Sequence, residues 1–188
     1  MGTDPNGFNN IVGWGPSTAM LDTANSYALL GSLDTISYTL PSVIEGVGVS
    51  FQSLRPTSTT TGTGTSITYT NAGLYAGWAN RLSGADKSTA YAVSYDFGAA
   101  KVAYSSIDST IGGAKTTDST YTISAPVTSA ASVGFSSGTY NLDGTKTNNS
   151  QLGAYYNLSK RTQAYVIYGK ASAASSTTTT AVGVNHAF

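Results

Sequence analysis

The chain has 188 residues and a formal net charge of zero, and charged residues make up only 10% of it, against about 25% in an ordinary soluble domain. It has no Cys and a single His, His186, which excludes thiolate metal sites, disulfide scaffolds and multi-histidine metal sites. A nucleic-acid binder would need a positive field that this chain lacks. Disorder is not expected either, because 40% of the residues are hydrophobic and 13 are Tyr.

The length allows one domain. No stretch approaches the roughly 20 apolar residues of a membrane helix. The first residues, Met1-Gly2-Thr3-Asp4, have neither the basic nor the apolar region of a signal peptide, so none is expected in this sequence. Residues 1–32 do not alternate in polarity, and we expect an irregular segment there, with one helical turn near 17–21.

From residue 33 onward, polar and apolar side chains alternate with a period of two, the pattern of a half-buried β-strand. Eleven segments show it and are predicted to be strands: 35–40, 47–52, 67–70, 74–79, 91–97, 101–105, 121–124, 131–136, 151–158, 163–168 and 181–188.

The links between these segments alternate between two sizes. Tight turns are predicted at 41–46, 71–73, 97–100, 126–129 and 157–161, and long Ser- and Thr-rich loops at 55–65, 82–88, 107–119, 140–150 and 171–180. Short turns at one rim and long loops at the other are typical of a transmembrane β-barrel. The two sets of side chains fit such a barrel, with Val, Leu, Ile, Phe and Tyr facing lipid and Ser, Thr, Gly and Asn facing an aqueous lumen. A soluble β-sandwich or a fibre-like surface protein also alternates, but its wet face usually carries Lys and Glu, which are rare here.

The end of the sequence resembles a known family. Residues 155–165 contain Tyr-x-Leu-Ser-Lys-Arg-Thr-x-x-Tyr, starting at Tyr156, and the chain ends in alternating apolar residues and Phe188. Both features resemble the last periplasmic turn and final strand of trimeric general-diffusion porins of Gram-negative outer membranes, of the Neisseria and Burkholderia type. Earlier pieces, at 36–41 and 94–98, match in type and order.

The resemblance implies a sixteen-stranded barrel of which this chain matches only the last eleven strands. An odd, unclosed set of strands cannot sit in lipid, so we expect a missing segment or a second chain to supply the rest; a re-closed barrel of ten or twelve strands is the alternative. Residues 1–32 would be the end of the inward-folded constriction loop and its return to the wall, with Asp4 and Asp22 facing the channel. The resemblance also implies a homotrimer in outer-membrane lipid, and Phe188 as the signal read by the outer-membrane assembly machinery.

Pore-lining candidates follow from the alternation. Arg81, Asp96 and Lys101 are the charged ones, and Gln52, Gln151, Asn157 and Asn185 the neutral polar ones. In such a pore, selectivity comes from width and lining charge. Other interpretations remain open: Arg81 could sit at the rim of a loop, and Lys101 could be solvated at a turn and pair with Asp96.

Three more residues have structural interpretations. Lys160 and Arg161 are expected to be solvated in their turn, and His186 to lie on the lipid side near the membrane interface. The sequence predicts no enzyme, cofactor or metal site, because the only His lies in the final strand and no phosphate-binding spacing is present. It predicts passive diffusion of small hydrophilic solutes and ions through the outer membrane. The alternative is a non-conducting surface barrel that acts in adhesion or structure.

Overall fold

The computed structural model describes residues 34–55, 60–172 and 176–186, which form one antiparallel sheet of eleven strands in sequence order. The strands are β1 (Asp34–Thr39), β2 (Val47–Arg55), β3 (Gly62–Asn71), β4 (Leu74–Ser83), β5 (Asp86–Asp96), β6 (Lys101–Ile111), β7 (Ala114–Pro126), β8 (Ala131–Leu142), β9 (Thr145–Ser159), β10 (Thr162–Ser172) and β11 (Ser176–His186). The predicted number, order and antiparallel arrangement of the strands are confirmed.

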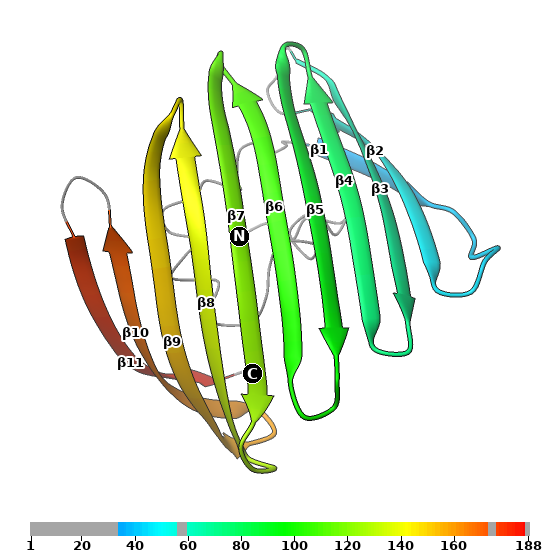
Figure 1. The fold of residues 1–188 in the computed structure, drawn as a ribbon. Helices are drawn as coiled ribbons and strands as arrows, with labels where there is room; N and C mark the ends of the chain where they lie inside the picture. Colours follow the sequence, from blue (N-terminus) through cyan, green and yellow to red (C-terminus); the bar gives the residue numbers. More distant parts are fainter. Residues whose placement is uncertain (1–33, 56–59, 173–175, 187–188) are drawn as a thin grey trace.

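The sheet is strongly curved (Figure 1). Strands β1 and β2 on one side and β10 and β11 on the other bend away from the viewer, so the viewed face is convex and the far face concave. β1 and β11 are the edge strands, and within the described residues they do not pair with each other. The sheet is therefore an unclosed section of wall. No helix in the described part of the chain is long and apolar enough to cross a membrane.

The connections at one rim are much tighter than predicted. Strands β4 and β5, β6 and β7, and β8 and β9 are joined by two residues each, at 84–85, 112–113 and 143–144. Gly112 and Gly113 have φ of 56° and 87°, and Asp143 and Gly144 have 47° and 92°. Positive φ at both central residues is the geometry of the two-residue hairpin turn that matches strand twist.

The prediction of long loops at 82–88, 107–119 and 140–150 is therefore wrong. These stretches belong almost entirely to strands, and β9 reaches 15 residues. The Ser and Thr residues there pair with residues of the neighbouring strands. For example, Thr116 pairs with Ser109 on one side and Leu142 on the other. The long links predicted at 55–65 and 171–180 lie partly outside the described residues, and their described ends are largely strand.

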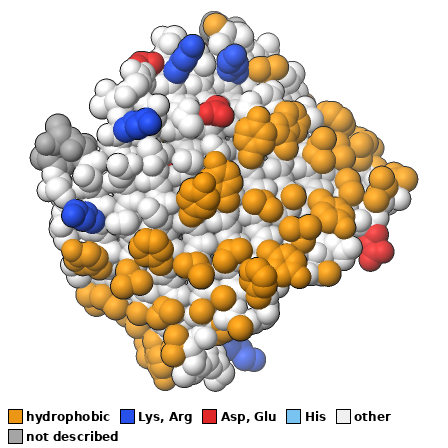
Figure 2. Space-filling model, viewed as in Figure 1, with side chains coloured by type: hydrophobic (Ala, Val, Ile, Leu, Met, Phe, Trp, Pro, Cys, Tyr) orange, Lys and Arg blue, Asp and Glu red, His pale blue; other side chains and the backbone are white. Residues whose placement is uncertain are grey.

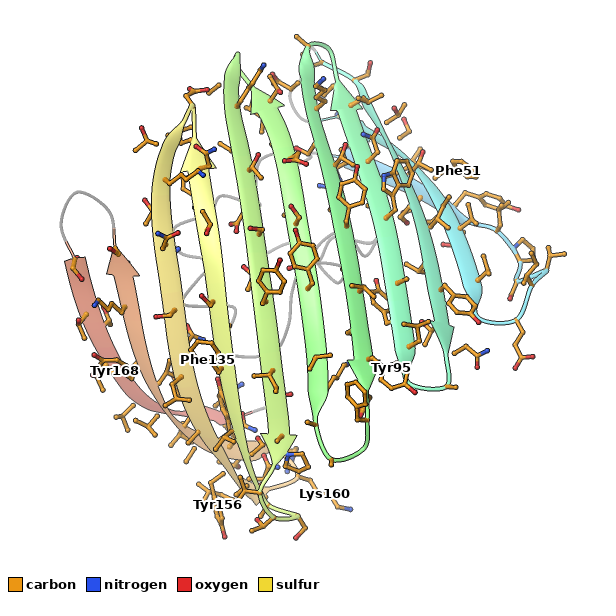
Figure 3. All side chains as sticks on the ribbon, in the orientation of Figure 1. Phe51, Tyr95, Phe135, Tyr156, Lys160 and Tyr168 are labelled. Carbon is orange, nitrogen blue, oxygen red and sulfur yellow. The ribbon has the colours of Figure 1, made fainter. Side chains whose placement is uncertain are left out.

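The two faces of the sheet differ in chemistry. The convex face exposes large apolar side chains, such as Phe51 at 47%, Phe135 at 45% and Tyr168 at 51%. Figure 2 shows them as a continuous band across the sheet, and Figure 3 shows all three on the same side. A soluble domain rarely exposes so large a contiguous apolar patch.

Aromatic rings lie within and at the borders of this band. Tyr104 and Tyr121 are partners on β6 and β7, with ring centroids 4.6 Å apart. Tyr95 and Phe97 meet edge to face at 4.7 Å near the β5–β6 turn. Rings at the borders of an apolar band are typical of sheets that cross a membrane.

Candidate functional site

The concave face carries mainly polar and small side chains. Its buried polar residues are Ser50, Gln52, Ser66, Arg81, Ser88, Ser94, Ser109, Asp118, Ser136 and Gln151. They alternate along each strand with the exposed apolar residues of the convex face, because successive side chains of a strand point to opposite faces. We call this surface the polar face.

Three of the predicted lining residues lie deep in the polar face. Gln52, Arg81 and Gln151 expose only 5%, 7% and 3% of their surface. None of the three is without an interaction partner. They are thus held in place by other groups rather than freely solvated.

Arg81 lies in a row of polar and small residues that crosses several strands. It is paired with Gly64 on β3 and with Ser88 on β5, and Gly64 is in turn paired with Gln52. Ser88 accepts a hydrogen bond from the Ser109 hydroxyl at 2.8 Å. The ladder places Arg81 in this row two residues before the end of β4 at Ser83, close to the 84–85 turn, so its lining role and its rim role both stay predictions.

The next row contains an acid that the sequence analysis missed. Ser50 and Ser66 share a hydrogen bond of 2.6 Å, and Ala79, Ala90 and Ile107 form a small apolar cluster beside them. Asp118 on β7 follows as the partner of Ile107 and is only 8% exposed. The polar face thus carries an acid as well as Arg81, three strands apart.

Asp118 was missed because it fell in a stretch predicted to be a loop. Counting back from Tyr121 in steps of two would have placed Ser119 outward and Asp118 inward. In this part of β7 the side chains on both faces are polar, so the period of two does not appear in the hydropathy pattern.

Asp96 and Lys101 lie at the opposite rim, as partners at the start of the β5–β6 hairpin. The Asp96 carboxylate accepts the Gly98 N–H at 2.8 Å, within the four-residue turn between the two strands. Asp96 is exposed and Lys101 half-buried. Asp96 therefore lies on the polar face and also forms a hydrogen bond within the β5–β6 turn.

Asn157 and Asn185 form a third group with Gln163, their common partner on β10. The Gln163 amide donates to the Asn157 carbonyl oxygen at 2.9 Å. Asn157 and Asn185 are exposed. The amides therefore lie at the accessible edge of the polar face, near the β9–β10 turn.

Two tyrosines cover glycines on the same face. A Cβ built on Gly183 would lie 2.5 Å from the hydroxyl of its partner Tyr165, and one on Gly153 would lie 2.6 Å from the Tyr155 hydroxyl. The rings thus occupy the space that a side chain on either glycine would need. Glycine next to an aromatic ring is a known device of curved sheets.

The remaining residues singled out in the sequence are not among the polar-face residues described above. Lys160 and Arg161 form the exposed β9–β10 turn, seen at the lower rim in Figure 3. His186 is exposed in the convex-face set, with Nδ1 2.8 Å from the Thr162 hydroxyl. Asp4, Asp22 and Phe188 lie outside the described residues. No group of three or more potential His, Cys, Asp or Glu metal ligands occurs among the residues that the structure describes.

A strand ladder with an apolar convex face and a polar concave face is a section of the wall of a transmembrane β-barrel. A sequence model of Gram-negative porins matches residues 1–176. The chain therefore belongs to the Gram-negative porin family, and its location is the outer membrane.

Solved porin structures have the same fold. The anion-selective porin from Comamonas acidovorans has a TM-score of 0.71 at 25% identity, covering 82% of this chain and 59% of its own. A mutant Rh. blastica porin has a TM-score of 0.68 at 19% identity, covering 87% and 58%. OmpT of Vibrio cholerae without loop L8 has a TM-score of 0.60 at 12% identity, covering 81% and 62%.

The chain thus spans roughly three fifths of the length of these porins. A comparison with curated proteins found no match.

Proposed function

We propose that these strands form part of the wall of a water-filled channel for passive diffusion of small hydrophilic solutes and ions across the outer membrane. One observation carries the proposal: a band of exposed apolar side chains crosses the convex face of the eleven-stranded sheet, while the concave face behind it is mainly polar. A sheet with lipid on one side and water on the other is stabilised by that division.

The proposed lining residues are those on the polar face: Gln52, Arg81, Asp96, Lys101, Asp118, Gln151, Asn157 and Asn185. In a pore of this kind the preference between anions and cations is set by its width and lining charges. Arg81 would favour anions and Asp118 cations. No step of such a function needs a nucleophile, a metal or a cofactor, so we assign no catalytic residue.

The channel requires strands beyond β1 and β11. In lipid, each unpaired backbone N–H or C=O group at a sheet edge costs roughly several kcal/mol. The sheet must therefore close into a barrel. We infer that a further segment or a second chain pairs with β1 and β11. A homotrimer, a constriction loop containing Asp4 and Asp22, and recognition of Phe188 by the assembly machinery belong to the same proposal and rest on the family resemblance.

Planar-bilayer recording tests the function. Purified protein should give stepwise, ohmic conductance. Silence under conditions in which a control porin conducts would contradict the channel and favour a non-conducting surface barrel.

Reversal potentials in a salt gradient test the lining. Arg81→Gln should shift the permeability ratio towards cations, and Asp118→Asn should shift it towards anions. Asp108→Asn is the matched control, because Asp108 lies on the neighbouring strand β6 in the convex-face set and is exposed. If Asp108→Asn shifts the ratio as much as Asp118→Asn, the assignment of the two faces is wrong.

A further inference from the structure

The charged side chains of the polar face are confined to one part of the sheet. Arg81, Asp96, Lys101 and Asp118 all belong to β4–β7. On β8–β11, whose residues are all described, the strand register places no Asp, Glu, Lys, Arg or His on the concave side. These four strands lie next to one another at one side of the sheet (Figure 1). The polar face therefore has a charged part and a neutral part.

Two tyrosines lie in the neutral part, on neighbouring strands. Tyr155 on β9 and Tyr165 on β10 are partners, and both are half-buried. The hydroxyl end of Tyr165 reaches across to Gly183 on β11, and that of Tyr155 reaches back along its own strand to Gly153. Both side chains therefore lie along the sheet instead of projecting away from it. One side of each ring is packed on a glycine, and the other is turned towards the concave side.

Three amides form a row beside the two rings. Asn157, Gln163 and Asn185 are partners across β9, β10 and β11, each two residues along its strand from Tyr155, Tyr165 or Gly183. The Gln163 amide donates to the Asn157 carbonyl oxygen at 2.9 Å. The Asn157 amide nitrogen, the Gln163 carbonyl oxygen and the Asn185 side chain form no hydrogen bond with another described residue. The row thus offers both donors and acceptors to a ligand.

The backbone at the amide row is held in a local bend. Thr162 is the partner of Ser159, whereas Gln163 is the partner of Asn157, so Leu158 is an extra residue on β9. A bulge of this kind bends the strand and redirects its side chains. The Asn157 N–H also donates to the Ala130 carbonyl oxygen, at 2.8 Å. The bend is thus fixed from the neighbouring β7–β8 turn.

Rings and amides in this arrangement suit a neutral ligand with many hydroxyls. The face of an aromatic ring is negative, and the C–H groups of a sugar ring can contact it as weak donors. Amides donate to and accept from hydroxyls. The strand spacing and the rise per residue place the backbones of the two tyrosines and three amides within about 12 Å of one another. A single sugar chain can therefore contact both groups.

We propose that Tyr155, Tyr165 and the amide row form a binding subsite for neutral sugars on the channel wall. The proposal rests on the proposed function, because the sugar reaches the subsite through the channel. It gives the neutral part of the polar face a class of solute of its own, whereas Arg81 and Asp118 act on ions. The rings contact the C–H faces of the sugar, and the amides bind its hydroxyls.

Saturation-transfer NMR with maltotriose tests the proposal on the purified protein in a zwitterionic detergent, which has no sugar headgroup. A polyethylene glycol of similar mass is the control ligand. The test variant Y155L/Y165L keeps apolar bulk over the glycines and removes the rings, and Y155F/Y165F keeps the rings. The matched control is Y140L. Tyr140 is half-buried on the concave side of β8, but it lies beside Asp118, about 26 Å along the strand from Ser132, the partner of Tyr155.

We expect Y155L/Y165L to weaken maltotriose binding by at least about fivefold, the effect of losing two aromatic contacts. Y140L and Y155F/Y165F should bind as the unchanged protein does, and polyethylene glycol should give no signal. Circular dichroism checks folding, and N157A/N185A replaces the leucine pair if that does not fold. Equal affinity of the test variant and Y140L would overturn the proposal. So would equal weakening by the leucine and phenylalanine pairs, or an equal signal from polyethylene glycol.

The NMR measurement does not require conduction, so it separates this proposal from the proposed function. A protein that binds maltotriose but gives no conductance in planar bilayers would contradict the channel alone. A protein that conducts but does not bind maltotriose would contradict the sugar subsite alone.

Discussion

Arginine substitutions along β5 test whether the convex face meets lipid. Val93 is 44% exposed and lies in the apolar band between its partners Ala76 and Tyr104. Thr89 lies on the same face of the same strand, four residues away, where its partners are Asn80 and Asp108. The two positions differ mainly in depth, so Val93→Arg and Thr89→Arg form a matched pair.

The expected magnitudes differ strongly. An arginine on the lipid face costs about 2–4 kcal/mol near the midplane and about 0–1 kcal/mol near the interface. Val93→Arg should therefore lower the ratio of folded to unfolded protein in vesicles by about 30-fold to about 900-fold. Thr89→Arg should change it by less than about sixfold, and Asp108 beside it favours a cation.

Equilibrium unfolding in guanidinium, with the protein folded into phosphatidylcholine vesicles, measures both values. If the face were in water, Val93→Arg would cost no more than a typical surface substitution, within about 0.5 kcal/mol. Equal effects at positions 93 and 89 would therefore refute the membrane interpretation of the band.

Two further predictions concern the ladder and a turn. A Cβ on Gly138 would lie 2.7 Å from the Ser119 carbonyl oxygen, whereas a Cβ on Gly134 of the same strand would lie 3.7 Å from its nearest neighbour. In urea unfolding, Gly138→Ala should therefore lower the free energy of unfolding by about 1–3 kcal/mol, and Gly134→Ala by less than about 0.5 kcal/mol. Equal costs would show that backbone crowding does not matter here. Asp96→Ala removes the acceptor of the Gly98 N–H and should lower the free energy of unfolding by about 0.5–1.5 kcal/mol in the same assay. Asp96→Asn keeps an acceptor and should lower it less. If both variants are equally unstable, the Asp96 carboxylate does not stabilise the β5–β6 turn through this hydrogen bond.

The strands could be predicted where one face is apolar. All eleven were found because Val, Leu, Ile, Phe and Tyr alternate with small polar residues across the apolar band. The prediction failed at 107–119, where both faces are polar. Beyond the band the outward side chains, such as Thr117 and Lys115, are as hydrophilic as the inward ones, so the period of two is invisible in hydropathy.

The two-residue turns had a local signal of a different kind. Asp143-Gly144 and Gly112-Gly113 are residue pairs typical of tight hairpins, and they fall in the middle of the stretches predicted to be loops. Turn chemistry would have shortened those loops where hydropathy could not.

The polar face was only partly predictable. Alternation placed Gln52, Arg81 and Gln151 on it because each stands beside apolar neighbours. Asp118 has no such neighbours. The Ser50–Ser66 and Ser88–Ser109 hydrogen bonds depend on strand register, which one sequence does not specify.

Single cysteines on β7 give the most direct test of the central claim, that one face meets water and the other lipid. The chain has no Cys, so each introduced thiol is the only one. Thr122 is half-buried in the concave-face set, and its neighbour Ile123 is 47% exposed on the convex face. Both lie at the depth of the apolar band. We predict that, in vesicles, a charged water-soluble methanethiosulfonate labels Thr122→Cys and not Ile123→Cys, and that a lipid-soluble maleimide shows the reverse preference. Equal labelling of the two positions by both reagents, with full labelling after denaturation, would contradict the account.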